Sequence, residues 1–252
     1  MNTYNLNFIS NENLFNHVQE TILKYRFKMD LKSFNQNLVD PIKLTFDHII
    51  YQKNPQLLIN DEIMRQIDKS NTNHIGYFHQ NIFNYLGNGW YVPAKGFDIV
   101  NDELKIFVEM KNKHNTMNSS SSQKTYMRMQ HAINQDPCAQ CFLVEVIAKN
   151  SQNIPWIISL EGEQLSDERI RRVSIDHFYH IVTGEKEAFK QLCEILPVVI
   201  KDVVNSIKQE MMQNTVFQEL ALISPNILQS LYLFSFAEYE GFEHFRYTDD
   251  AL

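Results

Sequence analysis

The stretch "FDIVNDELKIFVEMKNKHNT", residues 97–116, decides how the centre of this chain folds. Its apolar run "IFV" is typical of a buried strand, yet Glu109 and Lys111 follow at once. Because side chains alternate between the two faces of a strand, these two residues share one face and are near neighbours on it. A strand end that faces solvent would explain the two charges. A metal-dependent active site would explain them as well.

A second carboxylate lies upstream of this strand. Asp98 belongs to the short segment "KGFDIV", and turn residues at 101–103 separate that segment from "LKIFVEMK", the layout of a β-hairpin. Antiparallel pairing could bring Asp98 close to Glu109 and Lys111. Two carboxylates and a lysine at one sheet edge make an oxygen-rich site suited to Mg²⁺. In phosphodiester hydrolysis the carboxylates would hold the metal, while Lys111 would orient or deprotonate the attacking water or offset developing charge.

Composition is that of an ordinary globular protein of 252 residues, with 44% hydrophobic and 21% charged residues. No apolar run approaches the ~20 residues that span a membrane, and the first residues lack the features of a signal peptide. The three cysteines do not make a disulfide framework. We therefore expect a cytoplasmic protein without a membrane segment.

Charge is unevenly distributed along the chain. The net charge is −7, which counts against a protein coated in basic surface. The window from Lys105 to His131, however, holds five basic residues and one acid, a local charge of +4. Because nucleic-acid binding depends on where charge lies, this basic window is compatible with DNA binding around the unusual stretch.

The order of predicted elements defines the fold class. The first 70 residues are predicted as helices, including one that starts at Asp40 and Pro41 and a short one that ends near Ser70. A helix that ends at Gly87 precedes three strands, and a serine-rich loop and a helix precede the strand "CFLVEVIAK". The order αβββαβ predicts an α/β fold with a central mixed sheet flanked by helices.

Additional helices are expected before and after this core. We expect an N-terminal helical region at residues 1–70, a catalytic core at residues 71–184 and a C-terminal helical region at residues 185–252. The three regions are expected to form one compact domain. The two helical regions are interpreted as the parts that serve dimerisation and contact with DNA.

The hairpin, its acid and its element order resemble the PD-(D/E)xK restriction-endonuclease-like core, with "GFD" supplying the aspartate and "EMK" the second half of the motif. Phe97 stands where the usual proline would precede the aspartate. Three longer segments, "HIGYFHQNIF", "VEMKNKHNTMNSSSSQKTY" and "VSIDHFYHIVTGEKEAF", resemble the Eco47II/Sau96I type of type II restriction endonucleases. This resemblance implies a Mg²⁺-dependent homodimer that cuts both strands of double-stranded DNA at a short interrupted palindrome, with GGNCC as a candidate target.

Polar residues after the catalytic strand are candidates for DNA contact. The first group follows the strand directly and consists of Lys113, His114, Asn115 and Thr116. The second group surrounds the start of the next helix and consists of Ser119, Ser120, Ser121, Ser122, Lys124 and Arg128. A polar loop and an ordinary helix N-cap with solvated basic side chains remain the alternatives for the two groups.

Other polar residues have less specific interpretations. Gln80 could serve as an accessory residue that holds a metal-bound water, or it could belong to a polar packing network. Cys138 and Cys141 form a single CxxC, which is too few ligands for structural zinc, so buried free thiols are expected. His177 and His180 lie among aromatic residues and are expected to be structural.

The sequence thus predicts a sequence-specific, Mg²⁺-dependent DNA endonuclease of restriction type, with Asp98, Glu109 and Lys111 as its catalytic residues. Because a palindromic site has two-fold symmetry, a homodimer is expected. A structure-specific repair or junction-resolving nuclease on the same core and a non-catalytic DNA-binding module remain open. The basic window counts against a purely structural helical protein.

Overall fold

The computed structural model describes residues 3–114, 116–160, 162–207, 213–240 and 242–247. Asn115, one of the predicted DNA contacts, lies outside these residues. The chain divides into two compact units, Met1–Leu23 with His74–Lys208 (unit 1) and Lys24–Asn73 with Gln209–Leu252 (unit 2). Each unit therefore joins segments that are distant in the sequence. The boundaries expected from the sequence, after residues 70 and 184, do not coincide with these units.

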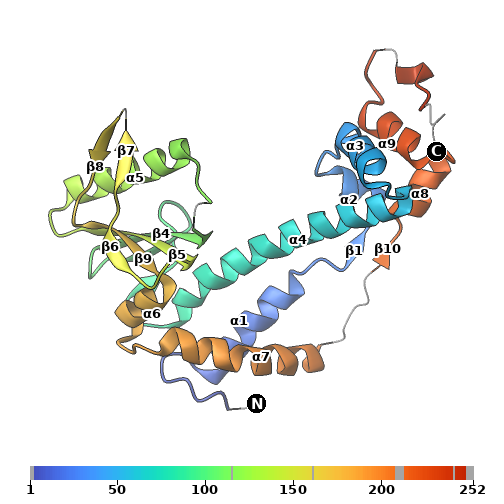
Figure 1. Ribbon diagram of the computed structural model, residues 1–252. Helices are drawn as coiled ribbons and strands as arrows, with labels where there is room; N and C mark the ends of the chain where they lie inside the picture. Colours follow the sequence, from blue (N-terminus) through green and yellow to red (C-terminus); the bar gives the residue numbers. More distant parts are fainter. Residues whose placement is uncertain (1–2, 115, 161, 208–212, 241, 248–252) are drawn as a thin grey trace. The chain divides into compact units, whose positions relative to one another are not determined.

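A six-stranded sheet forms the centre of unit 1 (Figure 1). Its strands, in spatial order, are β2 (Trp90–Tyr91), β3 (Ile99–Asn101), β4 (Ile106–Lys113), β5 (Gln140–Ile147), β9 (Ile170–Ser174) and β6 (Asn153–Pro155). The first three strands and the β9–β6 pair are antiparallel, whereas β4, β5 and β9 are parallel. The predicted mixed sheet is therefore confirmed. A separate hairpin contains β7 (Ile158–Leu160) and β8 (Glu163–Leu165).

The predicted hairpin is formed by β3 and β4. Ile99 is paired with Val108 and Asn101 with Ile106. Lys105, in the turn, has a positive φ of 55°. This register puts Asp98 directly before β3 and opposite Glu109 in the middle of β4.

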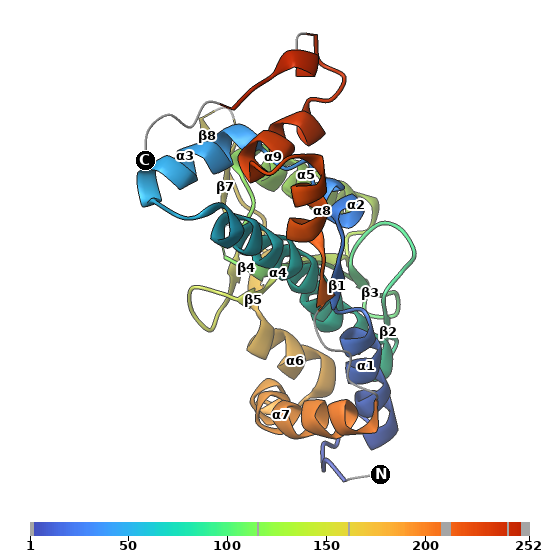
Figure 2. The same ribbon diagram turned by 90° about the vertical axis from the view of Figure 1, so that its right-hand side faces the viewer.

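Helices cover both faces of the sheet, as the near-continuous apolar run of β5 predicts. On one face, α5 (Ser119–Gln135) buries Tyr126, Met129 and Ile133 in the same cluster as Cys141 and Leu143 of β5. The alternate residues of β5 face the opposite layer, which contains α1 (Asn11–Leu23), the 3₁₀ helix η1 (Ile82–Tyr85), α6 (Ile175–Thr183) and α7 (Ala188–Ser206). The sheet is thus the middle layer of unit 1 (Figure 2).

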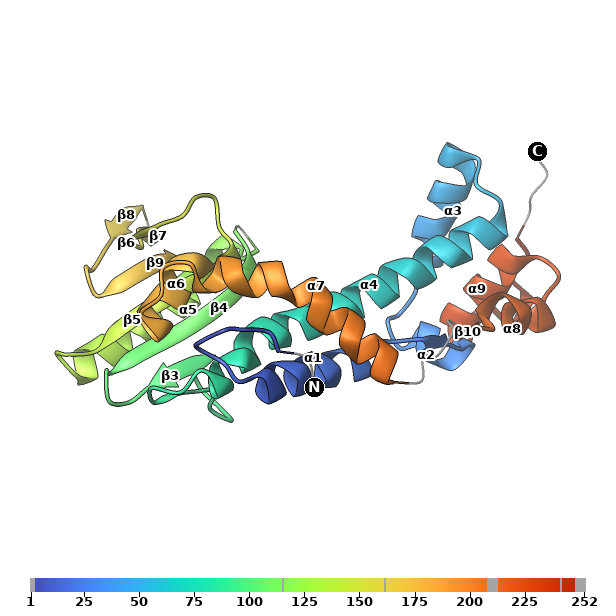
Figure 3. The ribbon, with the colours of Figure 1, turned by 90° about the horizontal axis from the view of Figure 1, so that it is seen from below.

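Segments from both ends of unit 1 complete its second helical layer. Helix α1 packs along α7 (Figure 3). Tyr4 Oη donates a hydrogen bond of 3.2 Å to Asp202. Buried Leu14 and Val18 of α1 join Val199 and Val203 of α7 in one core. The first 23 residues therefore belong to the same unit as the sheet.

Unit 2 has its own apolar core, to which residues of both its segments contribute. The unit contains β1 (Lys28–Met29) paired with β10 (Gln213–Asn214), the helices α2 (Leu31–Asn35), α3 (Pro41–Tyr51), α8 (Val216–Ile223) and α9 (Ile227–Ser235), and the 3₁₀ helix η2 (Phe242–His244). Asp40 caps α3 by accepting hydrogen bonds from the Ile42 and Lys43 amides, which confirms the predicted helix start.

The prediction of separate helices that end near Ser70 and near Gly87 was wrong in one respect. A single helix, α4 (Pro55–Asn81), replaces the short helix and most of the next one, and η1 continues to Tyr85. The polar run at residues 70–73 contains no glycine or proline to break the helix, so weak local propensity does not end it. No helix in the described ranges is long and apolar enough to cross a membrane.

The aromatic core of unit 1 generates a stability prediction. Phe178 of α6 is fully buried, and its ring centroid lies 4.8 Å from that of Phe83 and 5.4 Å from that of Trp90. Because Phe178→Ala would remove buried area and leave a cavity, we expect it to lower the free energy of unfolding by about 3–5 kcal/mol. Urea denaturation followed by circular dichroism measures the change. Leu104→Ala, at a residue 53% exposed, should change the free energy of unfolding by no more than ~0.5 kcal/mol. An equal loss of stability in the two variants would contradict the buried packing of Phe178.

Candidate active site

Backbone pairing fixes the Asp98 carboxylate against strand β4. The Asp98 amide donates to the Val108 carbonyl at 2.8 Å, and Asp98 Oδ2 accepts a hydrogen bond of 2.8 Å from the Met110 amide. The carboxylate is therefore tied to the residue between Glu109 and Lys111. Gln80 Nε2 donates to the Asp98 carbonyl at 3.0 Å, so its contact in this structure is with the backbone of the same residue.

Glu109 lies at the centre of a charged cluster. Only 8% of the residue is exposed, and it follows Phe107 on the face of β4 that α5 covers. Lys111 Nζ donates to Glu109 Oε1 at 2.8 Å, as expected for two residues on one strand face. The guanidinium of Arg128, from α5, binds the other oxygen, Oε2. The structure thus brings together Asp98, Glu109 and Lys111 and adds a second cation.

The two carboxylates influence each other electrostatically. Burial raises the pKa of Asp98 above its ordinary value, and the negative charge of Glu109 raises it further. The Met110 amide, Lys111 and Arg128 oppose this shift of the pKa without cancelling it. Asp98 and Glu109 are therefore close enough to repel each other in a partly desolvated environment.

This donor set fits a divalent cation. A cation between Asp98 and Glu109 would offset the repulsion that raises the pKa of Asp98. Within the described ranges, no group of three or more His, Cys, Asp or Glu side chains could hold a metal ion. Mg²⁺ needs no such group, because it is usually bound through one or two carboxylates and completes its shell with water and substrate phosphates. Asp98 and Glu109 are the residues that could hold it.

A pocket of about 520 Å³ opens over the cluster. Its lining consists of Glu109, Lys111, Thr116, Met117, Ser121, Lys124, Thr125 and Arg128. Four of the predicted DNA contacts therefore face the same space as the two catalytic candidates. Helix α5 supplies half of this lining, and Asn118 caps its start by accepting a hydrogen bond of 2.8 Å from the Ser121 amide.

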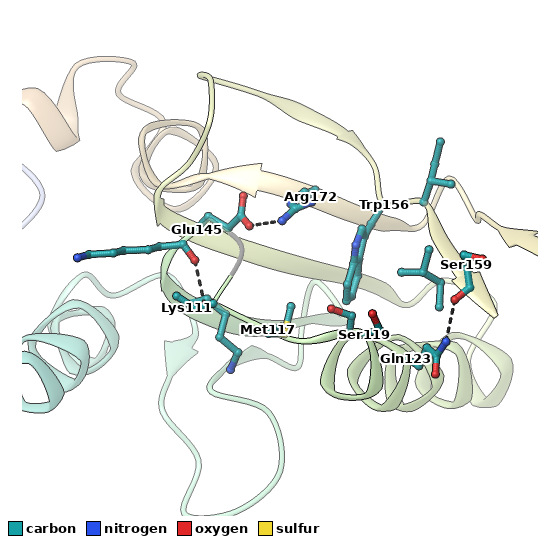
Figure 4. A pocket seen from close by; sticks show the side chains of 13 residues that line it. Lys111, Met117, Ser119, Gln123, Glu145, Trp156, Ser159 and Arg172 are labelled. Atoms are coloured by element: carbon teal, nitrogen blue, oxygen red, sulfur yellow. Dashed lines mark hydrogen bonds and ion pairs between the residues drawn. The ribbon is translucent and has the colours of Figure 1, made fainter. Parts of the chain in front are cut away.

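A second pocket, of about 260 Å³, also has Lys111 in its lining (Figure 4). Further predicted contacts, Lys113, Thr116, Ser119 and Ser122, line it as well. His114 and Ser120 line neither pocket. Lys111 therefore belongs to both pockets, and seven of the predicted contacts line one pocket or both.

The second pocket contains a buried ion cluster that sequence reasoning missed. Glu145 of β5 is 1% exposed, and it accepts hydrogen bonds from Arg172 at 2.5 Å and from His114 Nδ1 at 3.1 Å. The register pairs Glu145 with Lys111 on the neighbouring strand. The sequence offered only one sign of Glu145 as a functional residue, because it is the single acid inside the apolar run "FLVEVI". Its partner Arg172 is more than 25 residues away and carries no motif.

The CxxC cysteines are not bonded to each other. Cys138 and Cys141 are free thiols, as expected, and so is Cys193. Cys141 is buried as expected, whereas the expectation that Cys138 is buried was wrong, because it lies exposed in the turn before β5. Burial raises the pKa of Cys141 to about 12. A thiol held in its neutral form in this way is a core residue and not a metal ligand.

The raised pKa of Asp98 generates a prediction for Asp98→Asn. Above its raised pKa the folded protein has to hold Asp98 charged beside Glu109, which destabilises the folded state relative to the unfolded chain. Below the ordinary pKa of aspartate, Asp98 is neutral in both states, so this contribution vanishes. We therefore expect the variant to have the higher melting temperature at neutral pH in EDTA, with the difference lost on acidification. A variant that melts below the wild type at neutral pH would contradict this account.

Comparison with known proteins confirms the predicted resemblance. The family profile described as Eco47II restriction endonuclease matches residues 6–205, which include all of the site described above. The type II restriction enzyme Sau96I of Staphylococcus aureus is 32% identical over 213 residues, covering 80% of this chain and 82% of that enzyme. The type II restriction enzyme Eco47II of Escherichia coli is 30% identical over 215 residues, covering 79% and 88%. The chain therefore belongs to the Eco47II restriction endonuclease family.

Proposed function

We propose that this member of a restriction endonuclease family hydrolyses both strands of double-stranded DNA in a Mg²⁺-dependent reaction on a PD-(D/E)xK core. The observation that carries the proposal is the meeting of Asp98, Glu109 and Lys111 where β3 pairs with β4. The family membership supports the reaction class. The order of α4, three strands, α5 and β5 supports the core.

Each of the three residues has a distinct role in this proposal. Asp98 and Glu109 would hold Mg²⁺, which when bound polarises the scissile phosphate and lowers the pKa of water. The Met110 amide keeps Asp98 aimed at β4 through its hydrogen bond of 2.8 Å. Lys111 lines both pockets, so its ammonium group can orient a water molecule or offset charge on the pentacovalent phosphorane.

DNA would lie across the two pockets beside this site. The residues that we propose as its contacts are Lys113, His114, Asn115, Thr116, Ser119, Ser120, Ser121, Ser122, Lys124 and Arg128. Cationic and hydroxyl side chains favour contacts with phosphate, which supply most of the affinity of DNA-binding proteins. The interrupted palindrome GGNCC is the target proposed from the family likeness, and the cytoplasm is the proposed location.

A plasmid digest tests the proposed activity. Unmethylated plasmid that contains GGNCC sites should give discrete fragments with MgCl₂ and none with EDTA. Glu109→Ala and Lys111→Ala should each lower the cutting rate by a factor of about 10² or more, because each removes a group that stabilises the transition state. Gel electrophoresis gives the rates, and sequencing of the fragment ends identifies the cut site.

The control is Lys190→Ala, which removes a lysine on the exposed side of α7 and should cut like the wild type. If Lys111→Ala also cuts at the wild-type rate, the proposed mechanism is wrong. Products that follow DNA shape instead of sequence would favour the junction-resolving alternative. Tight binding without hydrolysis would favour a non-catalytic module.

We further propose that the protein acts as a homodimer, and unit 2 presents a surface suited to a second copy. Ile42, Phe46, Ile49 and Ile50 are each more than half exposed, and their spacing puts them on one face of α3. An exposed apolar patch of this kind marks an interaction surface. The Lys43–Asp47 ion pair at its rim would let opposite charges meet if two α3 helices packed antiparallel about a two-fold axis.

Sedimentation velocity tests this interface. We expect a dimer for the wild type and a shift towards monomer for Phe46→Glu, because two buried carboxylates would face each other across the axis. Leu222→Glu, at a residue of unit 2 that is 87% exposed, is the matched control and should remain dimeric. A monomeric wild type would rule out the homodimer, whereas a dimeric Phe46→Glu protein would place the interface elsewhere.

A further inference from the structure

The contacts of Arg128 differ from those expected for a residue that only binds DNA phosphate. Its guanidinium binds Glu109 Oε2, and Nη1 donates to the Gly96 carbonyl at 3.3 Å. The guanidinium carbon lies 4.8 Å from the ring centroid of Phe97, within the range of a cation–π contact. The carboxylate of Glu109, the carbonyl of Gly96 and the ring of Phe97 therefore hold Arg128 beside Asp98.

Both oxygens of Glu109 are occupied by cationic side chains. Lys111 Nζ binds Oε1 at 2.8 Å, and Arg128 binds Oε2. A divalent cation would bind one of these oxygens at a distance of ~2.1 Å, where it would repel a cationic nitrogen donor on the same oxygen. Arg128 comes from another element and its side chain is 42% exposed, compared with 29% for Lys111, so Arg128 is the group that has room to leave.

We propose that Arg128 is a positioning residue that binds Glu109 Oε2 and competes there with the divalent cation. This inference rests on the proposed metal site. Arginine stays protonated at any physiological pH, so the competition ends only when its side chain moves.

The charges of the cluster predict that Arg128 leaves Glu109 when the metal binds. When both carboxyl groups are ionised, the two negative charges of Asp98 and Glu109 balance the two positive charges of Lys111 and Arg128. Adding a divalent cation while Arg128 stays in place would leave the site strongly positive. Arg128 also lines the 520 Å³ pocket with Lys124, so a DNA phosphate in that pocket offers its guanidinium a new partner. Metal binding and DNA binding are therefore mutually favourable, and Arg128 couples them.

Titration of the DNA-free protein with MnCl₂ tests the competition, with free Mn²⁺ followed by electron paramagnetic resonance. Arg128→Met keeps a long side chain and removes its charge. We expect this variant to bind Mn²⁺ about fivefold or more tightly than the wild type, because the ion pair no longer opposes the metal. Arg128→Lys keeps a cation at the same position and should bind Mn²⁺ less tightly than Arg128→Met.

Lys124→Met is the matched control, because it removes one positive charge from the same helix and the same pocket. Its Mn²⁺ affinity should rise less than that of Arg128→Met. An equal rise in the two variants would show a general charge effect and overturn the competition. Unchanged or weaker binding by Arg128→Met would also overturn it, since a residue that only holds Glu109 in place would lower the affinity when removed.

Glu109→Gln separates this inference from the function on which it rests. If Glu109→Gln binds Mn²⁺ as well as the wild type, the proposed metal site itself is wrong. If Glu109→Gln loses Mn²⁺ binding and Arg128→Met matches the wild type, only the role of Arg128 is wrong. Melting curves of all four variants in EDTA verify that each protein is folded.

Discussion

The hydrogen bond from the Met110 amide to Asp98 Oδ2, 2.8 Å long, is the contact on which the proposed catalytic arrangement depends. It joins a residue that precedes one strand to the middle of the next, so the two carboxylates meet only in this β3–β4 register. A slip of one residue would turn Glu109 and Lys111 to the opposite face of the sheet. The buried partners of β4 on both faces hold that register, because they would lose their packing in any other.

The position of the Asp98 carboxylate, buried beside Glu109, destabilises the folded state. Burial and the neighbouring Glu109 raise the pKa of Asp98, which means that the folded chain holds a carboxylate where its charge is disfavoured. Lys111 and Arg128 reduce this repulsion without removing it. Carboxylates whose pKa values are shifted by burial and by a neighbouring carboxylate are common at functional sites, and a bound cation would offset their repulsion.

Strand periodicity and turn residues were sufficient to predict the central part of the fold. The alternation in "KIFVEMK" put Glu109 and Lys111 on one face, and the turn near residue 102 predicted the hairpin that brings Asp98 to them. Long-range partners left no such pattern. Arg128 follows Glu109 by 19 residues and meets it only because α5 packs on β4, and the Glu145–Arg172 contact requires the parallel β5–β9 pairing. Local spacing carries no information about either contact.

Unit 2 is built from two segments that are distant in the sequence, so its core cannot form early in translation. Its core joins Phe34 and Leu58 of the first segment, Lys24–Asn73, to Leu220 and Leu228 of the second, Gln209–Leu252. The family profile ends at residue 205, before that second segment begins. On the ribosome, the apolar side chains of the first segment emerge more than a hundred residues before the helices that bury them. Nascent chains of this protein therefore expose a hydrophobic surface during most of their synthesis, and such a surface is a target for chaperones and a route to aggregation.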